Sequence, residues 1–307
     1  IDITVKMYSR WPKFGDASAG LPHREYMAEV HMGNDRDIFD EDPDGVPLYE
    51  GRMVEQFDHR AKGYRSGRGR SAVWEELPFS EPTKSIQPQW RIPTLDIPDK
   101  TVERMLKYRI GFCDVTSPTN ERSLNAALIP PGCLCGDKVP TICFQDGFSW
   151  AYMIWLCVAN SFAMDYLVRK KVALKMSYTV LDSLPFPRLS KAHPQSKELV
   201  SRGAMLTCTG PEMVAYWDAL ATDGWVPPRK GPDHIPGVLD EAERHRIRAE
   251  IDAIVAKQLF GLTSTELNYV LDAFPTVHRR DVKASGSPLT RSSILAAFDA
   301  GGRTPSP

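Results

Sequence analysis

Hydrophobic and polar positions follow two different patterns along the chain. Before about residue 145, apolar residues form short runs between turn-forming residues, most clearly over 109–116, 123–129 and 139–144. Short apolar runs at close spacing are typical of strands in a mostly antiparallel or mixed sheet. After residue 149 the apolar runs lengthen and take a helical period. The pattern therefore predicts an α+β fold, in which a mixed or antiparallel sheet precedes a helical C-terminal part.

The clearest predicted helix spans 240–260. Asp240 is a residue type that caps helix N-termini, and apolar residues recur on one face from Ile247 to Leu259. Gly261 follows directly, as glycine commonly does at a helix end. Further helices are predicted over 149–172, 196–208 and 211–221, and from the capping box Thr263–Glu266 to about residue 273. The first of these is the most apolar stretch, but it is shorter than the roughly 20 residues that cross a bilayer.

Proline, glycine and charge runs divide the chain into four predicted segments. Residues 1–46 are rich in Gly, Pro, Asp and Asn, and the end of the chain is rich in Ser, Gly, Thr and Pro. We therefore expect an irregular N-terminal segment over 1–46, an α+β domain over 47–190, a helical region over 191–280 and a flexible tail over 281–307.

Charge and cysteine content limit the classes of function. The 307 residues include 38 Lys and Arg against 39 Asp and Glu, so any polyanion must be met by a local basic patch. Cys133, Cys135 and Cys143 are spaced as C-x-C with a third thiol, without the second pair or the His that a zinc site needs. We interpret the six cysteines as free thiols and expect no metal site.

Sequence motifs of autonomous catalysis are missing. The chain has no P-loop, no H-E-x-x-H and no G-x-S-x-G. No Glu stands two places before a Lys, as the common metal-dependent nuclease motif requires. We therefore assign no catalytic residue and no cofactor to this chain.

One segment, 52–70, is locally basic. It follows a predicted strand over 47–57 and has six cations against two acids. Arginine side chains match phosphate oxygens, and glycines let the backbone approach a surface closely. The candidate phosphate contacts are Arg60, Lys62, Tyr64, Arg65, Arg68 and Arg70. The alternative is a solvated basic loop without a partner.

A second polar segment, 109–122, lies around a predicted strand–turn–strand. Asn and Arg side chains pair with the edges of adenine and guanine. The candidate base-edge residues are Arg109, Thr116, Asn120 and Arg122. Because Thr, Asn and Pro are also ordinary turn residues, a purely structural turn is the alternative.

Five segments carry a family resemblance when they are taken together. They are PLYEGRMVEQFDHRAKGY (47–64), RIGFCDVTSPTNERSLNAALIP (109–130), FSWAYMIWLCVANSFAMDYLVRKKV (148–172), LDSLPFP (181–187) and RAEIDAIVAKQLFGLTSTELNYVLDAFP (248–275). In this order they resemble the C-terminal target-recognition half of type IIG-like restriction–modification adenine-N6 DNA methyltransferases and related phage-defence methyltransferases. The resemblance implies that an upstream core, absent from this chain, binds S-adenosylmethionine and performs methylation.

The resemblance and the basic segment together predict sequence-specific binding of double-stranded DNA. The expected partners are DNA and the N-terminal methyltransferase core or other defence subunits, in the cytoplasm and without a membrane. The alternative is a protein-interaction or scaffold module of a phage-defence complex that reads no bases. In that case the apolar stretch 148–172 would be partly exposed on this chain.

Overall fold

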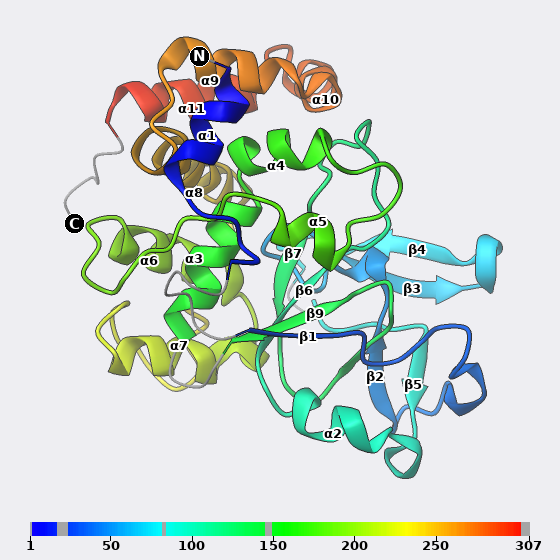
Figure 1. The fold of residues 1–307 in the computed structure, drawn as a ribbon. Coiled ribbons are helices and arrows are strands. Elements are labelled where there is room, and N and C mark those ends of the chain that lie inside the picture. The colour runs from blue at the N-terminus through cyan, green and yellow to red at the C-terminus, as the bar shows by residue number, and fades with distance from the viewer. Residues whose placement is uncertain (1, 17–23, 82–83, 145–148, 302–307) are drawn as a thin grey trace.

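Three small sheets lie beside the helices in a computed structural model that describes residues 2–16, 24–81, 84–144 and 149–301 (Figure 1). The largest sheet is antiparallel, with β1 (Arg24–Met27), β9 (Thr141–Phe144), β6 (Arg109–Phe112) and β7 (Ala126–Ile129) in that order. A second sheet has the order β5 (Trp90–Ile92), β2 (Val46–Tyr49) and β8 (Leu134–Cys135), and β2 pairs with β8 in parallel. The third is a hairpin of β3 (Lys62–Ser66) and β4 (Val73–Glu76).

Helices cover one side of the largest sheet and build the C-terminal part (Figure 1). With the strands they form the α+β fold that the sequence predicts. The helices are α1 (Ile3–Arg10), α2 (Asp99–Met105), α3 (Ser149–Ala159), α4 (Phe162–Arg169), α5 (Tyr178–Asp182), α6 (Ser196–Thr207), α7 (Val214–Thr222), α8 (Glu241–Ala253), α9 (Ser264–Asp272), α10 (Pro275–Ser285) and α11 (Leu289–Asp299).

Helix α3 lies at the centre of the hydrophobic core. Every residue from Trp150 to Ala159 is buried, and the helix packs against α6, α7, α8 and strands β6, β7 and β9. One hydrophobic cluster runs from Met7 to Phe298. The core therefore crosses the predicted boundary at residue 190, and the helical C-terminal region buries its apolar faces against the sheet domain rather than forming its own core.

The prediction of one helix over 149–172 is wrong, because the helix breaks at Asn160. The side chain of Asn160 accepts from the backbone N–H of Ala126 at 3.1 Å and donates to its carbonyl at 2.9 Å. Ser161 then caps α4 by accepting from the N–H of Met164 at 3.2 Å. Among the described helices, none is long and apolar enough to cross a membrane by itself; α3 and α4 reach that length only as a pair, bent by 64°.

Both ends of the chain are more ordered than the sequence predicts. Within the expected irregular segment 1–46, helix α1 is capped by Asp2 and strand β1 pairs with β9. Within the expected flexible tail 281–307, α11 packs against α8 and buries Ile294 and Phe298. Asp281 joins the two last helices by accepting from the N–H of Thr290 at 2.7 Å. The remaining tail residues, 302–307, lie outside the described part of the chain.

The local signals of the C-terminal helices are confirmed. Asp240 accepts from the N–H of Glu243 at 2.8 Å, and Thr263 and Glu266 form the reciprocal capping box. Gly261 has a φ of 64° directly after this stretch. The predicted helix 240–260 is α8 followed by a π-helical turn, Ile254–Leu259, which sequence periodicity does not distinguish from α-helix.

Replacing Asn160 with Ala should destabilise the fold by about 2–3 kcal/mol, because it leaves the buried N–H of Ala126 without its partner. Urea unfolding would measure the loss. Asn125→Ala, at a half-buried neighbouring position, is the matched control. Equal stabilities of the two variants would contradict the assigned role of Asn160.

Candidate functional site

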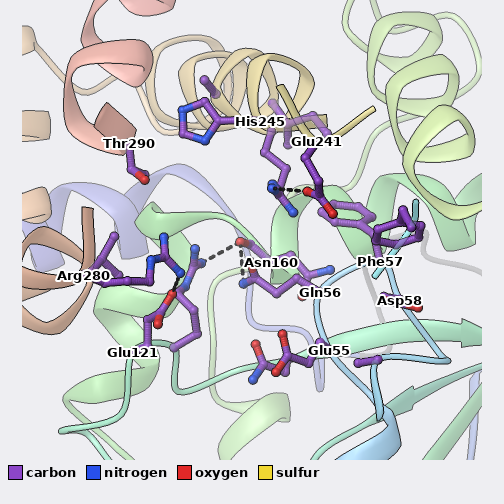
Figure 2. Close-up of a pocket in the computed structure, with 18 of the residues that line it drawn as sticks. Glu55, Gln56, Phe57, Asp58, Glu121, Asn160, Glu241, His245, Arg280 and Thr290 are labelled. Carbon is purple, nitrogen blue, oxygen red and sulfur yellow. Dashed lines mark hydrogen bonds and ion pairs between the residues drawn. The ribbon is translucent and has the colours of Figure 1, made fainter. Parts of the chain in front are cut away.

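A cavity of about 530 Å³ opens where five parts of the chain meet (Figure 2). The parts are the turn 55–58, the base of the β3–β4 hairpin, the loop 121–125, the α3–α4 break and the helices α8, α10 and α11. The segments 47–64, 109–130, 148–172 and 248–275, which lie far apart along the chain, contribute Glu55, Arg122, Asn160 and Arg248 to the lining. A concave, mixed polar and apolar space of this size is the usual form of a ligand site.

The turn on one wall of the cavity is held in a strained backbone conformation. Glu55 and Asp58 exchange backbone hydrogen bonds of 2.8 and 3.1 Å, which places Gln56 and Phe57 at the tip of a two-residue turn. Phe57 has a φ of 61°, the one positive value at a non-glycine residue in the described part of the chain. A bulky residue in this region costs on the order of 1 kcal/mol or more, and such strain clusters at functional sites.

The side chains around the turn hold it against the helix break. Gln56 donates to the carbonyl of Asn160 at 3.0 Å, and the N–H of Phe57 donates to the carbonyl of Ala126 at 3.0 Å. Figure 2 shows Gln56 and Asn160 side by side in the middle of the cavity lining. The strained turn is therefore fixed by the same strand residue that the Asn160 side chain binds.

A buried carboxylate, Asp252, lines the same cavity. It is 6% exposed, and one oxygen accepts from the N–H of Phe162 at 2.6 Å, at the start of α4. Its other oxygen has no hydrogen-bond partner among the described residues. Burial raises the pKa of Asp252 to about 6, although Arg122, the Phe162 N–H and Arg248 favour the charged form. At neutral pH the ionised form of Asp252 therefore lowers the free energy of unfolding.

The side chain of a second cavity carboxylate, Glu55, has no hydrogen-bond partner within the described ranges. It is exposed at the base of the strained turn, yet the surrounding protein raises its pKa by desolvation. Arg248 has a favourable electrostatic interaction with both carboxylates, and its ion pair with Glu241 measures 3.8 Å. The cavity thus combines two carboxylates that can accept further hydrogen bonds with an arginine whose ion pair is long.

The predicted phosphate residues separate into one buried and several exposed side chains. Arg60 is 2% exposed: it donates to the carbonyl of Lys84 at 2.8 Å and to Thr209 at 3.1 Å, and it pairs with Glu212 at 3.2 Å. These contacts hold Arg60 inside the protein. The expectation that Arg60 contacts phosphate is therefore wrong for this conformation.

The other phosphate candidates lie on the β3–β4 hairpin rather than in the irregular loop that the sequence predicts. Lys62 pairs with Glu76 at 3.7 Å, Arg65 with Glu75 at 2.6 Å and Arg68 with Glu41 at 2.8 Å. The hydroxyl of Tyr64 donates to the carbonyl of Gly67 at 2.6 Å, where φ is 82° and glycine is needed. The side chain of Arg70 lies outside the described part of the structure.

Arg109 is fully buried and cannot reach a base edge. Its guanidinium binds Glu29 through two hydrogen bonds of 2.6 and 2.9 Å, and both side chains are 0% exposed. It also donates to the carbonyl of Cys133 at 2.8 Å, and Glu29 accepts from the N–H of Cys135 at 2.8 Å. The pair joins the segment after β1 to β6 and β8, which is a structural role.

Of the other base-edge candidates, Asn120 alone has an exposed side chain. Thr116 is buried, and its hydroxyl donates to the carbonyl of Ser123 at 2.7 Å. Arg122 lies in the cavity wall, where it binds Asp165 at 2.7 Å and the carbonyl of Asn160 at 2.6 Å and lies over the ring of Phe162. Thr116 and Arg122 therefore hold the turn in place, as the structural alternative predicts.

The cavity carboxylate Asp252 was missed at the sequence level, and so was its buried neighbour Asp165. Each interrupts an apolar helical face, Asp165 after Phe162-Ala-Met and Asp252 directly after Ile251. A charged residue within an apolar face is the signal that could have found them, because burying an ion requires a specific partner or function.

The thiols lie apart from the cavity. Cys133, Cys135 and Cys143 are buried, and burial raises the pKa of Cys133 to about 11 and that of Cys135 well above its ordinary value. Within the described ranges, no group of three or more His, Cys, Asp or Glu residues is arranged to hold a metal ion. Neither the models of known protein families nor the curated proteins gave a significant match to the chain.

Asp252→Asn should raise stability at alkaline pH. The pKa of Asp252 is higher in the folded state than its ordinary value of 3.8, so the native protein loses stability as pH rises from about 4 to about 6. The asparagine keeps the acceptor for the Phe162 N–H without the buried charge. We expect a gain of about 2 kcal/mol at pH 8 that disappears near pH 4. Urea unfolding over this pH range would measure it.

The control for this pH profile is Asp299→Asn, at the exposed end of α11. Its stability should follow that of the unmodified protein at every pH. A loss of stability in Asp252→Asn at pH 8 would contradict the assigned cost of the Asp252 charge.

Arg109→Ala should destabilise the protein by about 3–5 kcal/mol, because it leaves the buried Glu29 carboxylate unpaired. The double variant Glu29→Gln/Arg109→Met should recover part of this loss, since no buried charge remains. Denaturant unfolding distinguishes this structural role from base reading, which predicts altered DNA sequence choice with unchanged stability.

Proposed function

We propose that this chain binds double-stranded DNA as the target-recognition part of a methyltransferase whose catalytic core is not in this chain. The observation that carries the proposal is the β3–β4 hairpin, which extends away from the body and bears Lys62, Arg65 and Arg68 (Figure 1). Between residues 62 and 76 there are four cations and two acids in a chain of net charge −1. Such a local excess is the electrostatic footprint of a polyanion contact.

The ion pairs on the hairpin are compatible with DNA binding. The Arg65 and Glu75 side chains are 38% and 60% exposed, and those of Arg68 and Glu41 are 72% and 57% exposed. Pairs at this exposure contribute at most about 1 kcal/mol. A phosphate can therefore replace either carboxylate at small cost, whereas the buried Arg60 and Arg109 would have to leave their partners.

Sequence choice would rest on Asn120, since its side chain remains exposed beside the cavity loop. Asparagine pairs with adenine through its amide, which makes a defined base contact. The N-terminal methyltransferase core, with S-adenosylmethionine, or other defence subunits would be partners in the cytoplasm. The scaffold alternative loses its expected docking face, because α3 and α4 are buried within this chain.

The double variant Arg65→Ala/Arg68→Ala should weaken binding of any duplex by at least about tenfold at low salt. It should also lower the slope of log affinity against log salt by about 2, one unit for each lost phosphate contact. Fluorescence anisotropy with labelled duplexes at several salt concentrations would measure both quantities.

The matched control is Arg279→Ala/Lys283→Ala, which removes two exposed cations of α10. It changes the net charge equally but should leave the salt slope unchanged. Equal losses in the two double variants would assign the effect to net charge, and no DNA binding at low salt would favour the scaffold alternative.

A further inference from the structure

The cavity has a net negative charge once its own ion pairs are set aside. Arg280 pairs with Glu121, Arg122 with Asp165, and Asp58 with Lys84 at 2.6 Å. The remaining lining carboxylates are Glu55, Glu76, Glu241 and Asp252, of which Glu76 pairs with Lys62 at 3.7 Å and Glu241 with Arg248 at 3.8 Å. Four carboxylates against these two cations leave a formal charge of −2 when all are ionised.

Two of these carboxylates have unused capacity to accept hydrogen bonds. Asp252 is more than nine-tenths buried, and one of its oxygens has no partner among the described residues. Glu55 has no side-chain hydrogen bond or ion pair within the same ranges. Acceptors that line an open cavity take their hydrogen bonds from water or from a ligand donor inside that cavity.

The walls between the charged groups are aromatic. Phe57, Phe79 and Phe162 line the cavity, and each is less than 10% exposed. Lys84 and Arg244 already lie over the ring of Phe79 and Arg122 over that of Phe162, so these rings offer a ligand apolar surface to cover alkyl groups. The volume of about 530 Å³ also exceeds what a bare metal ion fills, so the lining suits an organic group.

We propose that this cavity binds an organic cation: a guanidinium or primary ammonium group on an apolar stem, with Asp252 and Glu55 accepting hydrogen bonds from the cationic head. The aromatic walls would cover the stem. The head could belong to a small molecule or to a basic side chain of a partner protein, and both present the same chemistry. This proposal does not depend on DNA binding.

Removal of the Arg248 charge should change the affinity of the cavity in opposite directions for a cationic and for an anionic ligand. Arg248 lies within electrostatic range of both Glu55 and Asp252. Its removal makes the cavity more negative, so a cationic ligand should bind more tightly to Arg248→Gln. A ligand that binds through a phosphate or carboxylate would instead lose its counter-ion and bind more weakly.

The experiment is calorimetric titration of the full chain with agmatine, which has a guanidinium and an ammonium group on a butyl stem. We expect binding that Asp252→Asn weakens by about tenfold or more, as loss of a charge-assisted hydrogen bond does. Glu55→Gln, at an exposed position, should also weaken it, and Arg248→Gln should strengthen it. Adenosine monophosphate should not bind.

Glu103→Gln, an exposed carboxylate on α2 outside the cavity, is the control and should leave agmatine affinity unchanged. Binding of a capped arginine amide in addition to agmatine would indicate the side chain of a partner protein, and agmatine alone a small molecule. The proposal would be overturned if agmatine did not bind at millimolar concentration. It would also be overturned if Asp252→Asn and Glu55→Gln bound agmatine as tightly as the unmodified chain, or if Arg248→Gln bound it more weakly.

Discussion

Two hydrogen bonds between the side chain of Asn160 and the backbone of Ala126 fix the centre of this structure. They stop the most apolar helix where it meets the sheet, since an asparagine amide presents the same donor and acceptor as a neighbouring strand. The break then leaves backbone groups for other segments. The carbonyl of Asn160 accepts from Gln56 and Arg122, and the N–H of Phe162 binds Asp252. One interruption of a helix thereby gathers the turn, the loop and α8 around the cavity.

Buried charged groups are satisfied to different degrees in this structure. Arg109 and Glu29 satisfy each other with nearby backbone groups, and Lys84 forms a close pair with Asp58, which lines the cavity. Among the described residues, one oxygen of Asp252 has no hydrogen-bond partner, and outside the cavity the same holds for one oxygen of Asp114 and two nitrogens of Arg244. The strained backbone of Phe57 lies in the same lining as Asp252. Strained backbone and a carboxylate with a raised pKa in one concave site are the combination that clusters at functional sites.

Local signals in the sequence predicted the elements, but not the partners of the charged residues. The Asp240 cap and the Thr263–Glu266 box depend on residues three positions apart, so the sequence contains the whole interaction. Arg109 and Arg60 depend on Glu29 and Glu212, which are 80 and 152 positions away along the chain. A cluster of arginines in sequence therefore says little about which of them are free. The helix break was missed for the same reason, since Ala126 is 34 positions from Asn160.

The hairpin and the cavity have opposite charge and share the Lys62–Glu76 pair, whose atoms are 3.7 Å apart. A polyanion on the hairpin would draw the Lys62 ammonium group outward. The negative charges of Glu76 and Glu55 would then be less well balanced by a nearby cation. A cation in the cavity would restore that balance and release Lys62 for the polyanion. Since each ligand reduces the cost of the other, the two proposed sites should be coupled with positive sign, and by linkage the coupling must be reciprocal. The physical basis of that coupling is the single ammonium group that both sites share.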